Sequence, residues 1–243
     1  MKKALLFLVF SLALQGCKEE QPAQIITFAT SAEYPPFEYH ENGELMGFDI
    51  DLARLIAKEL NKKAEFKDMQ FSSILLELQD GCVDAAISTI SASDERKKNF
   101  DFSDIYYNES MSIVFRKDSE LNGKEKFRGK KIACQLGTTM QIWLEGNAAS
   151  AEIVRMDNNN LAIEALKSGH VDGVLIDSSQ ASHFCKKNSD LGFSFIAIAH
   201  SGYAIAFKKG SKLTEEINLA IKNLREKGEL DKLEKKWITN VGK

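Results

Sequence analysis

The sequence contains little proline, little cysteine and few long apolar runs. Its 243 residues include 3 prolines and 15 glycines, too few for an extended low-complexity linker. The 4 cysteines and 4 histidines are scattered without metal-ligand spacing, so we expect neither a metal site nor a cofactor. The 32 basic and 35 acidic residues give a formal charge of -3, which offers no broad attraction for nucleic acid. The remaining composition is that of a globular protein with one large domain or two of about 100 residues each.

One segment, at the N-terminus, is apolar enough to enter a bilayer. Lys2 and Lys3 precede the apolar residues 4–14, and Gly16 comes shortly before a polar stretch. This order is typical of a secretory signal peptide, which we assign to residues 1–16. The apolar core of 11 residues is too short for a spanning helix, which needs about 20. A buried N-terminal helix is the alternative, and the charges that bracket the run argue against it.

Cys17 resembles the acylated cysteine of bacterial lipoproteins, although Gln15 stands where their motif usually has a small residue. The resemblance implies a lipid anchor on Cys17, a tether over residues 17–24 and an exported protein held at a membrane surface in the periplasm. The other cysteines are Cys82, Cys134 and Cys185. An odd number in an exported protein means at least one free thiol or an intermolecular bond, and we expect buried, unreactive thiols.

Short segments of strand and helix character alternate along the rest of the chain. We expect strands at residues 25–30, 83–88, 110–116, 131–135, 153–156, 171–177, 193–199 and 203–207. We expect helices at residues 49–60, 72–78, 138–144, 160–167, 179–186, 213–226 and 230–237. Asp49 and Asp51 are interpreted as capping the first helix and Ser72 or Ser73 the second, which Gly81 ends. The alternation predicts an α/β fold with largely parallel sheets.

Part of the chain repeats itself. Residues 78–87 (LQDGCVDAAI) resemble residues 166–175 (LKSGHVDGVL), 88 positions further on. Both segments read as the end of a helix, a glycine stop and a Val-Asp pair that opens a buried strand. A spacing of about one domain predicts two similar lobes. The alternative is a chance similarity between two ordinary helix-turn-strand units.

Polar side chains follow the buried strand of each predicted lobe, where open α/β sheets bind ligands. The first lobe offers residues 88–93 with Arg96 beyond them, and the second offers Asp177 and residues 135–139 at a helix start. Arg96 is suited to a carboxylate, as are the backbone N–H groups of that helix start. Asp177 supplies the opposite charge for an ammonium group. Together these residues predict a site for a zwitterion.

Seven motifs, in this order, resemble the family of periplasmic solute-binding proteins for polar amino acids, the capture subunits of ABC importers. They are residues 34–38 (YPPFE), 47–53 (GFDIDLA), 84–88 (DAAIS), 94–98 (DERKK), 101–107 (DFSDIYY), 135–139 (QLGTT) and 235–237 (KKW). The match covers residues 25–237. It implies a two-lobed periplasmic-binding-protein-like fold of type II, in which each lobe is a mostly parallel sheet flanked by helices.

The resemblance also implies how the chain is divided between the lobes. Lobe 1 is expected to comprise residues 25–115 and 208–243, and lobe 2 residues 116–207. Two hinge strands are expected to cross near residues 114–117 and 206–208, so that the C-terminal helices return to lobe 1. The cleft between the lobes is expected to close on the ligand as a clamshell and to present it to a membrane permease with its ATPase.

The resemblance gives each cleft residue a role. Arg96 is expected to bind the α-carboxylate of an amino acid and Asp177 its α-ammonium group, while Tyr34 and Phe71 enclose its side chain. The α groups are also expected to contact Thr89, Ser91, Thr138 and Thr139, and the ligand side chain to contact Ser31, Ser88 and Gln135. No catalytic residue is expected.

Structural alternatives exist for the residues on which this interpretation depends. Arg96 could be a solvated member of the charged run at residues 94–98. Phe71 could belong to the core, as most phenylalanines do. Asp177 could cap the helix that follows it, and Thr138 or Thr139 could do the same for theirs. The matching order of cation, anion and aromatic pair at the edges of the lobes favours ligand binding.

Arginine is the ligand that these side chains fit best. A guanidinium can stack on two aromatic rings and still donate hydrogen bonds in its own plane. Family members that select lysine, ornithine or histidine commonly have an aspartate where Ser31 stands, and Glu33 is a nearby substitute for that charge. Members that select glutamine often have a lysine where Gln135 stands. Lysine, ornithine, histidine, glutamine and cystine remain the alternatives.

Two other functions occur on this fold. Cyclohexadienyl and arogenate dehydratases share the fold and the export signal, and they need a general acid over the leaving hydroxyl. Glu33 is the one unassigned glutamate or histidine within the cleft motifs, so we expect a binding protein and not an enzyme. A ligand sensor or surface lipoprotein with the same cleft is the other alternative.

Overall fold

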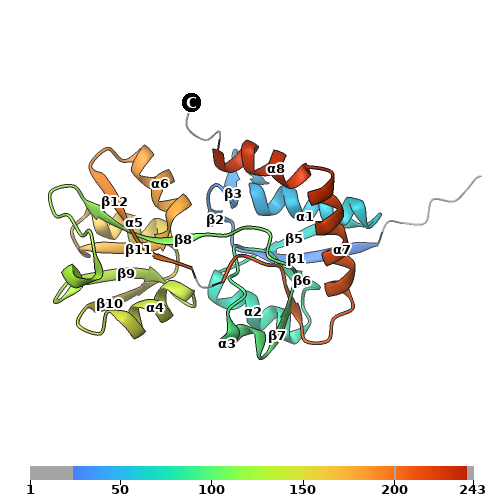
Figure 1. The fold of residues 1–243 in the computed structure, drawn as a ribbon, viewed down its shortest axis with the longest axis horizontal. Coiled ribbons are helices and arrows are strands. Elements are labelled where there is room, and N and C mark those ends of the chain that lie inside the picture. The colour runs from blue at the N-terminus through green and yellow to red at the C-terminus, as the bar shows by residue number, and fades with distance from the viewer. Residues whose placement is uncertain (1–23, 200, 240–243) are drawn as a thin grey trace, which may run out of the picture.

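The computed structural model describes residues 24–199 and 201–239. It has two lobes side by side, each with a sheet between layers of helices (Figure 1). The predicted signal peptide, Cys17 and residues 17–23 of the predicted tether lie outside the described residues. Within the described ranges, no helix has the length and apolar character needed to cross a membrane.

The first lobe contains a five-stranded sheet. Its strands are β1 (Ile25–Thr30), β5 (Lys63–Asp68), β6 (Ala85–Ala86), β7 (Phe100–Phe102) and β13 (Ala206–Lys208). Their order is β5–β1–β6–β13–β7, with β1 parallel to both of its neighbours and β13 antiparallel to both of its own. The helices of this lobe are α1 (Phe48–Glu59), α2 (Phe71–Asp80), α3 (Asp94–Lys97), α7 (Leu213–Glu226), α8 (Glu229–Glu234) and the π-helical turn η2 (Lys235–Thr239).

The second lobe repeats this plan. Its strands are β8 (Ser110–Arg116), β9 (Lys131–Gln135), β10 (Glu152–Met156), β11 (Gly173–Asp177) and β12 (Leu191–Ile198). They lie in the order β10–β9–β11–β8–β12, with β9 parallel to both neighbours and β8 antiparallel to both of its own. The helices of this lobe are η1 (Lys124–Phe127), α4 (Thr139–Asn147), α5 (Asn159–Lys167) and α6 (Ser178–Lys187).

The two similar sequence segments make equivalent contacts at the start of a strand in each lobe. The Asp84 carboxylate accepts a hydrogen bond from the Thr27 N–H at 2.8 Å, which ties the start of β6 to β1. Asp172 does the same for the Lys131 N–H at 2.9 Å, between β11 and β9. Gly81 and Gly169, at the ends of α2 and α5, both have the left-handed backbone that glycine favours. The prediction of two similar lobes is therefore confirmed.

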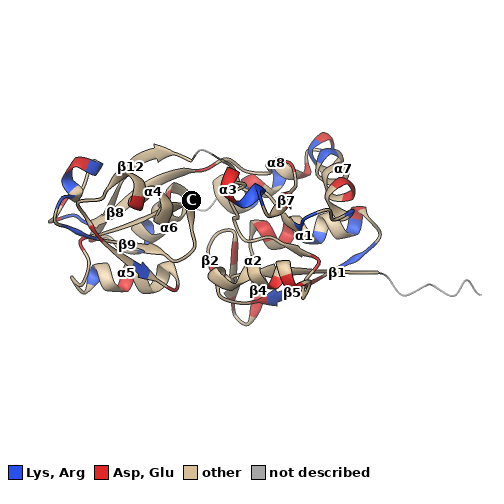
Figure 2. Ribbon diagram, turned by 90° about the horizontal axis from the view of Figure 1, so that it is seen from below, with Lys and Arg blue, Asp and Glu red and all other residues tan. Residues whose placement is uncertain are grey.

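Both sheets are buried on two faces, as their apolar strands predict. In the first sheet, Phe28 and Phe207 pack with α1, α7 and α8, whereas Ala29 and Ala206 pack with α2. In the second sheet, alternate residues of β9 divide in the same way between α4 on one face and α5 with α6 on the other. In the view of Figure 2, acidic and basic residues are interspersed along the ribbons of both lobes.

A small antiparallel sheet adjoins the cleft and was absent from the sequence expectations. It consists of β2 (Glu33–Tyr34), β3 (Glu38–Glu41) and β4 (Glu44–Met46). Gly47 follows it with a φ of 128°, and a Cβ there would lie 2.0 Å from the Phe37 carbonyl oxygen. This close approach brings the end of the small sheet directly onto the start of α1.

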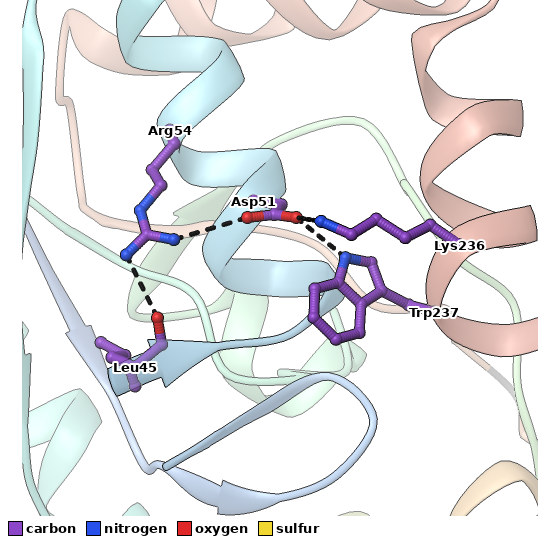
Figure 3. Close-up of polar contacts among 5 residues, drawn as sticks. All are labelled: Leu45, Asp51, Arg54, Lys236 and Trp237. Atoms are coloured by element: carbon purple, nitrogen blue, oxygen red, sulfur yellow. Dashed lines mark hydrogen bonds and ion pairs between the residues drawn. The ribbon is translucent and has the colours of Figure 1, made fainter. Parts of the chain in front are cut away.

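The capping roles predicted for Asp49 and Asp51 are wrong. Helix α1 begins one residue earlier, after Gly47, and has no side-chain cap. Asp49 is completely buried beneath the cleft. Asp51 instead accepts hydrogen bonds from Lys236 at 2.7 Å and from the Trp237 indole at 2.9 Å, and so fastens the C-terminal helical turn to α1 (Figure 3).

The second helix also begins earlier than predicted. Gln70, and neither Ser72 nor Ser73, occupies the position before α2, and no side chain caps that end. Gly81 ends the helix in the left-handed conformation, as predicted. Of the strand predicted at residues 83–88, only Ala85–Ala86 pairs as β6, because the chain then turns into the cleft loop.

The chain crosses between the sheets earlier than we predicted. Residues 111–115 pair with β11, so residues 114–117 belong to the second sheet and its edge and not to a crossing. Residues 206–208 pair with β7 and belong to the first sheet. The connecting segments are residues 103–109 and, within the described part of the chain, residues 201–205; they meet where Tyr107 and Tyr203 form a β-bridge. Helices α7 and α8 return to the core of the first lobe, as predicted.

The three described cysteines are free thiols. Cys134 is fully buried in β9, and burial raises the pKa of its thiol to about 12. Burial likewise raises the pKa of the half-buried Cys185 to about 11. Cys82 is exposed, so the prediction of a buried thiol is wrong at this position.

Candidate ligand-binding site

The residues predicted to bind a ligand lie around two adjoining hollows between the lobes. The space that the lining residues surround, open solvent included, is about 360 Å³ in one hollow and about 200 Å³ in the other. The first contains the residues expected at the ligand's α groups, and the second contains Ser31 and Ser88, which are expected at its side chain. Four residues line both hollows: Tyr34, Phe71, Gln135 and Asn159. All eleven sequence-predicted positions therefore meet in one cleft, and their contact with a ligand stays a prediction.

Arg96 lies on the first-lobe wall and reaches across the cleft. Its guanidinium donates to the Ser91 carbonyl at 2.9 Å and to the Gly137 carbonyl of the second lobe, also at 2.9 Å. The Ser93 hydroxyl accepts from the Arg96 N–H at the start of α3, which fixes the backbone that carries this side chain. Unlike the exposed Lys97 and Lys98 beside it, Arg96 is partly buried. The solvated-run alternative therefore fails for Arg96.

Asp177 lies on the opposite wall, at the end of β11. It occupies the position before α6 but makes no capping hydrogen bond, so the capping alternative fails. The first turn of α6 is held instead by Glu109, which accepts from the Ser179 N–H at 3.3 Å. One oxygen of the Asp177 carboxyl accepts from the Tyr34 hydroxyl of the first lobe. Its other oxygen, Oδ1, is buried and has no hydrogen-bond partner in the described part of the chain.

Burial shifts the titration of both groups. Desolvation lowers the pKa of Arg96 to about 10, which still leaves the guanidinium charged at neutral pH. Desolvation, together with the negative charge of Glu109, raises the pKa of Asp177 to about 7. The hydroxyls of Tyr203 and Tyr34, which lie close to the carboxyl, offset part of that rise. An ammonium group at Asp177 would favour the ionised carboxylate and lower this pKa again.

Arg96 and Asp177 are opposite charges in one hollow without an ion-pair partner among residues 24–199 and 201–239. Buried charges in proteins are normally paired, because an unpaired charge loses its hydration without compensation. A molecule with a carboxylate at one end and an ammonium group near it would pair both charges at once. This arrangement is the electrostatic signature of a site for a zwitterion.

The two aromatic residues differ in their surroundings. Tyr34 is buried and its hydroxyl is held by Asp177. Phe71 is half-buried, packs at the edge of a core cluster and faces the Arg96 guanidinium at 5.7 Å from the ring centroid. The ring of Phe71 therefore lines the cleft as predicted, and it also stabilises the cation that is expected to bind the carboxylate.

The threonines at the start of α4 have different roles. Thr138 caps the helix, because its hydroxyl accepts from the Gln141 N–H at 3.4 Å and donates to the Gln135 carbonyl at 2.7 Å. The capping alternative is therefore confirmed for its side chain. The Thr139 hydroxyl lies 3.4 Å from the Ser91 hydroxyl of the first lobe, inside the larger hollow. Thr89 lines the same hollow with a φ of 47°, a strained conformation for a non-glycine residue.

The smaller hollow presents hydrogen-bond acceptors. Ser88 donates its hydroxyl proton to Glu38 at 2.9 Å and accepts from the Ser31 N–H at 3.0 Å. Gln135 donates its amide N–H to the Asp157 carbonyl at 3.1 Å, which leaves its own carbonyl oxygen available as an acceptor. A ligand side chain rich in N–H donors is the best complement to these groups.

Sequence reasoning missed two buried residues here. Glu38 lines the smaller hollow, and Asn159 lines both, where it donates to Gln180 at 2.7 Å. Glu38 is part of the YPPFE motif, but nothing in a linear motif shows that its carboxyl turns beneath Ser88. Asn159 follows the α5 cap residue Asn158, and a run of three asparagines gave no signal of which one faces the cleft.

Comparisons with known proteins agree with this geometry. Residues 26–240 match the model of the bacterial extracellular solute-binding proteins, family 3. The chain belongs to this family. The arginine-binding extracellular protein ArtP of Bacillus subtilis (strain 168) is 37% identical to this chain, over 98% of this chain and 99% of its own length. Family membership indicates an exported protein.

Solved structures show the same fold. An ancestral arginine-binding protein bound to arginine has a TM-score of 0.85 and 37% identity, over 89% of this chain and 99% of its own. The same TM-score, with 38% identity and the same coverage, is found for an ancestral arginine-binding protein bound to glutamine. This family-3 chain is a solute-binding protein and not an enzyme, and its two-lobed type II fold is confirmed.

Proposed function

We propose that this family-3 chain captures L-arginine between its lobes. The observation that carries the proposal is the pair of opposite, unpaired charges at Arg96 and Asp177 in one hollow. That pair supports an α-amino acid as the ligand class. The acceptors of the adjoining hollow, Ser88, Gln135 and Glu38, support a side chain with several N–H donors, and the rings of Tyr34 and Phe71 suit a planar cation. Arginine combines all three features.

The capture step is closure of the cleft. Contacts between the lobes already involve the proposed ligand residues: Arg96 with Gly137, Tyr34 with Asp177 and Ser91 with Thr139. A ligand that binds both walls better than one wall alone shifts the equilibrium towards the closed form. In this proposal the closed form then delivers arginine to the permease of an ABC importer.

The ligand assignment is tested by isothermal titration of L-arginine, lysine, ornithine, histidine, glutamine and cystine into the purified protein. We expect arginine to bind most tightly, by about 1.4 kcal/mol or a factor of about ten over the next ligand. We expect this margin because the other side chains offer fewer N–H donors to Ser88 and Gln135 than a guanidinium does. Tighter binding of glutamine or cystine than of arginine would refute the assignment.

We also propose that Cys17 carries the lipid that holds the protein at a membrane. The support is the sequence alone, with its short apolar leader directly before Gly16-Cys17. Cells fed a labelled palmitate analogue should label the wild-type protein and not Cys17→Ala. A Cys82→Ala variant controls for reaction at the exposed thiol and should keep its label. Equal label in wild type and Cys17→Ala would end this proposal.

A further inference from the structure

Two carboxyl groups lie buried together beneath the smaller hollow. Glu38, on β3, is 1% exposed and Asp49, on α1, is 0% exposed. Glu38 lines the hollow itself, beside Ser31 and Ser88. Neither carboxyl has a lysine, arginine or histidine partner within the described ranges. The sequence expectation for this region was a missing counter-charge, with Glu33 as a substitute, and the structure places a different acidic group there.

The hydrogen bonds of the pair use one oxygen of each carboxyl. Asp49 Oδ2 accepts from the Thr89 N–H and from the Tyr106 hydroxyl, both at 2.8 Å. Glu38 Oε1 accepts from the hydroxyls of Ser88 at 2.9 Å and Thr89 at 3.4 Å. The remaining oxygens, Glu38 Oε2 and Asp49 Oδ1, are buried and receive no donor from the described residues. A proton held between the two carboxyls would satisfy both oxygens.

The energetics favour one retained proton. Desolvation, and next the charge of Asp49, raise the pKa of Glu38 well above its ordinary range. Desolvation raises the pKa of Asp49 to about 7, although the bonds from Thr89 and Tyr106 act in the opposite direction. Two adjacent carboxylates without a cation are costly in a medium of low polarity, so one of the two protonates first. The two carboxyls therefore titrate as a unit, at a pH above the ordinary range of carboxylic acids.

Ser88 connects this pair to the ligand space. Because its hydroxyl proton points to Glu38, its oxygen faces other groups only as an acceptor, and Ser31 N–H uses one of its lone pairs. An N–H donor of a ligand in the hollow can use the other. The charge of the pair then acts on the ligand side chain through one hydroxyl, over a short path in a desolvated site.

We propose that Glu38 and Asp49 determine the charge of the side chain that the cleft accepts, by releasing their shared proton when a guanidinium enters. The proposal rests on arginine capture as the proposed function. The proton passes to solvent, the pair gains one negative charge, and the bound guanidinium offsets it. An uncharged side chain of the same shape binds with the proton retained. Glu38 and Asp49 are thus positioning residues that act through Ser88.

The sign of the pH dependence follows from linkage. Binding that releases a proton strengthens as pH rises, by up to a factor of about ten per pH unit below the pair's apparent pKa. L-citrulline replaces the guanidinium by an uncharged ureido group and keeps the α groups. Arg96 and Asp177 therefore act equally on both ligands, and their contribution cancels in the ratio of arginine to citrulline affinity.

The other ionisable groups around the pair would not produce the same pH dependence. The Tyr106 hydroxyl donates to Asp49, whereas the Tyr34 hydroxyl donates to Asp177. Desolvation raises the pKa of both phenols well above ordinary values, so they keep their protons. Glu33 lines the same hollow from β2 and is more exposed than Glu38. Glu33 is therefore the alternative source of the counter-charge, and substituting it distinguishes its contribution from that of Glu38.

The test is calorimetric titration of arginine and citrulline into the full protein at about pH 6 and about pH 8, each in two buffers of different ionisation enthalpy. Citrulline affinity, if weak, is measured by displacement of arginine. The difference between buffers gives the protons released per ligand bound. We expect more protons released with arginine than with citrulline at about pH 6, and an affinity ratio that grows with pH.

Variants locate the effect. Glu38→Gln keeps an acceptor for Ser88 and removes the charge, so arginine affinity should fall by a factor of about ten or more while citrulline affinity changes by less than about threefold. The affinity ratio should also lose its pH dependence. Glu41→Gln, at an exposed position on the same strand, is the matched control and should behave as wild type. Asp49→Asn should remove the pH dependence in the same way.

Each contrary result has a distinct meaning. Equal proton release for arginine and citrulline in wild type overturns the role of the pair and leaves arginine capture standing; this measurement needs no variant to fold. Loss of the arginine preference in Glu33→Gln and not in Glu38→Gln also overturns it. Absence of arginine binding at both pH values overturns the proposed function, and the role of the pair with it.

Discussion

Replacing Arg96 with alanine should weaken L-arginine binding by a factor of about a hundred or more. Removing one partner from a desolvated ion pair costs about 3 kcal/mol or more, because the other charge stays buried without compensation. In this site the stranded charge is the ligand carboxylate. The variant also loses the bridge from Arg96 to the Gly137 carbonyl of the second lobe, which weakens closure. Isothermal titration measures the effect.

Two further substitutions make this test specific. Lys97→Ala removes an exposed cation from the next position of α3 and should leave binding unchanged. Arg96→Lys keeps the charge and loses the planar fork that contacts two carbonyls, so its affinity should lie between wild type and Arg96→Ala. Unchanged arginine affinity in a folded Arg96→Ala protein would remove Arg96 from the site.

Replacing Asp177 with asparagine should have two opposite effects, on affinity and on stability. Affinity for any α-amino acid should fall about a hundredfold, because the ammonium group loses its counter-charge in a buried site. The ligand-free variant should nevertheless unfold at a higher temperature than wild type near pH 8. Asparagine keeps an acceptor for the Tyr34 hydroxyl and carries no charge to desolvate.

The sign of the stability effect follows from the raised pKa. Burial raises the pKa of Asp177 to about 7 in the folded protein, whereas an unfolded aspartate ionises near about 3.9. The folded state therefore binds the extra proton between these values, and its stability falls as pH rises from about 4 to about 7. The full difference is at most about 4 kcal/mol, at 1.36 kcal/mol for each pH unit.

Ligand binding reverses this dependence. An ammonium group favours the ionised Asp177, so citrulline affinity in wild type should rise with pH up to about 7. In Asp177→Asn it should not vary over that range. Asp190→Asn, at an exposed position of the same lobe, is the control for both stability and binding. A ligand-free Asp177→Asn protein that is less stable than wild type at pH 8 would contradict the raised pKa.

Much of the fold could be predicted from the sequence because its signals are local. Amphipathic helices that end at a glycine, and apolar strands covered on both faces, leave recognisable patterns in the sequence. The repeated Val-Asp pair also identified the equivalent strands of the two lobes. The strand crossings could not be placed, because the segment at residues 110–116 looks like any apolar strand. Its pairing with β11 and β12 depends on residues 58 to 88 positions away.

The residues of the site were likewise predictable only where their signals are local. Arg96, Asp177 and the aromatic pair follow strand ends or known motifs, and the structure gathers them in one cleft. Asp49 was interpreted as a helix cap because aspartate at a helix start usually is one. Its burial beside Glu38 arises from the close approach of Gly47 to Phe37, which draws the start of α1 under the cleft. A contact of this kind between backbone segments leaves no trace in a linear pattern.

The central claim is that Arg96 and Asp177 pair with the two charges of one bound amino acid. A crystal structure of the protein with L-arginine tests it most directly. The account predicts the ligand carboxylate within about 3 Å of the Arg96 guanidinium and the ligand ammonium within about 3 Å of Asp177 Oδ1. A ligand bound in the cleft with either side chain turned away from it would contradict the account.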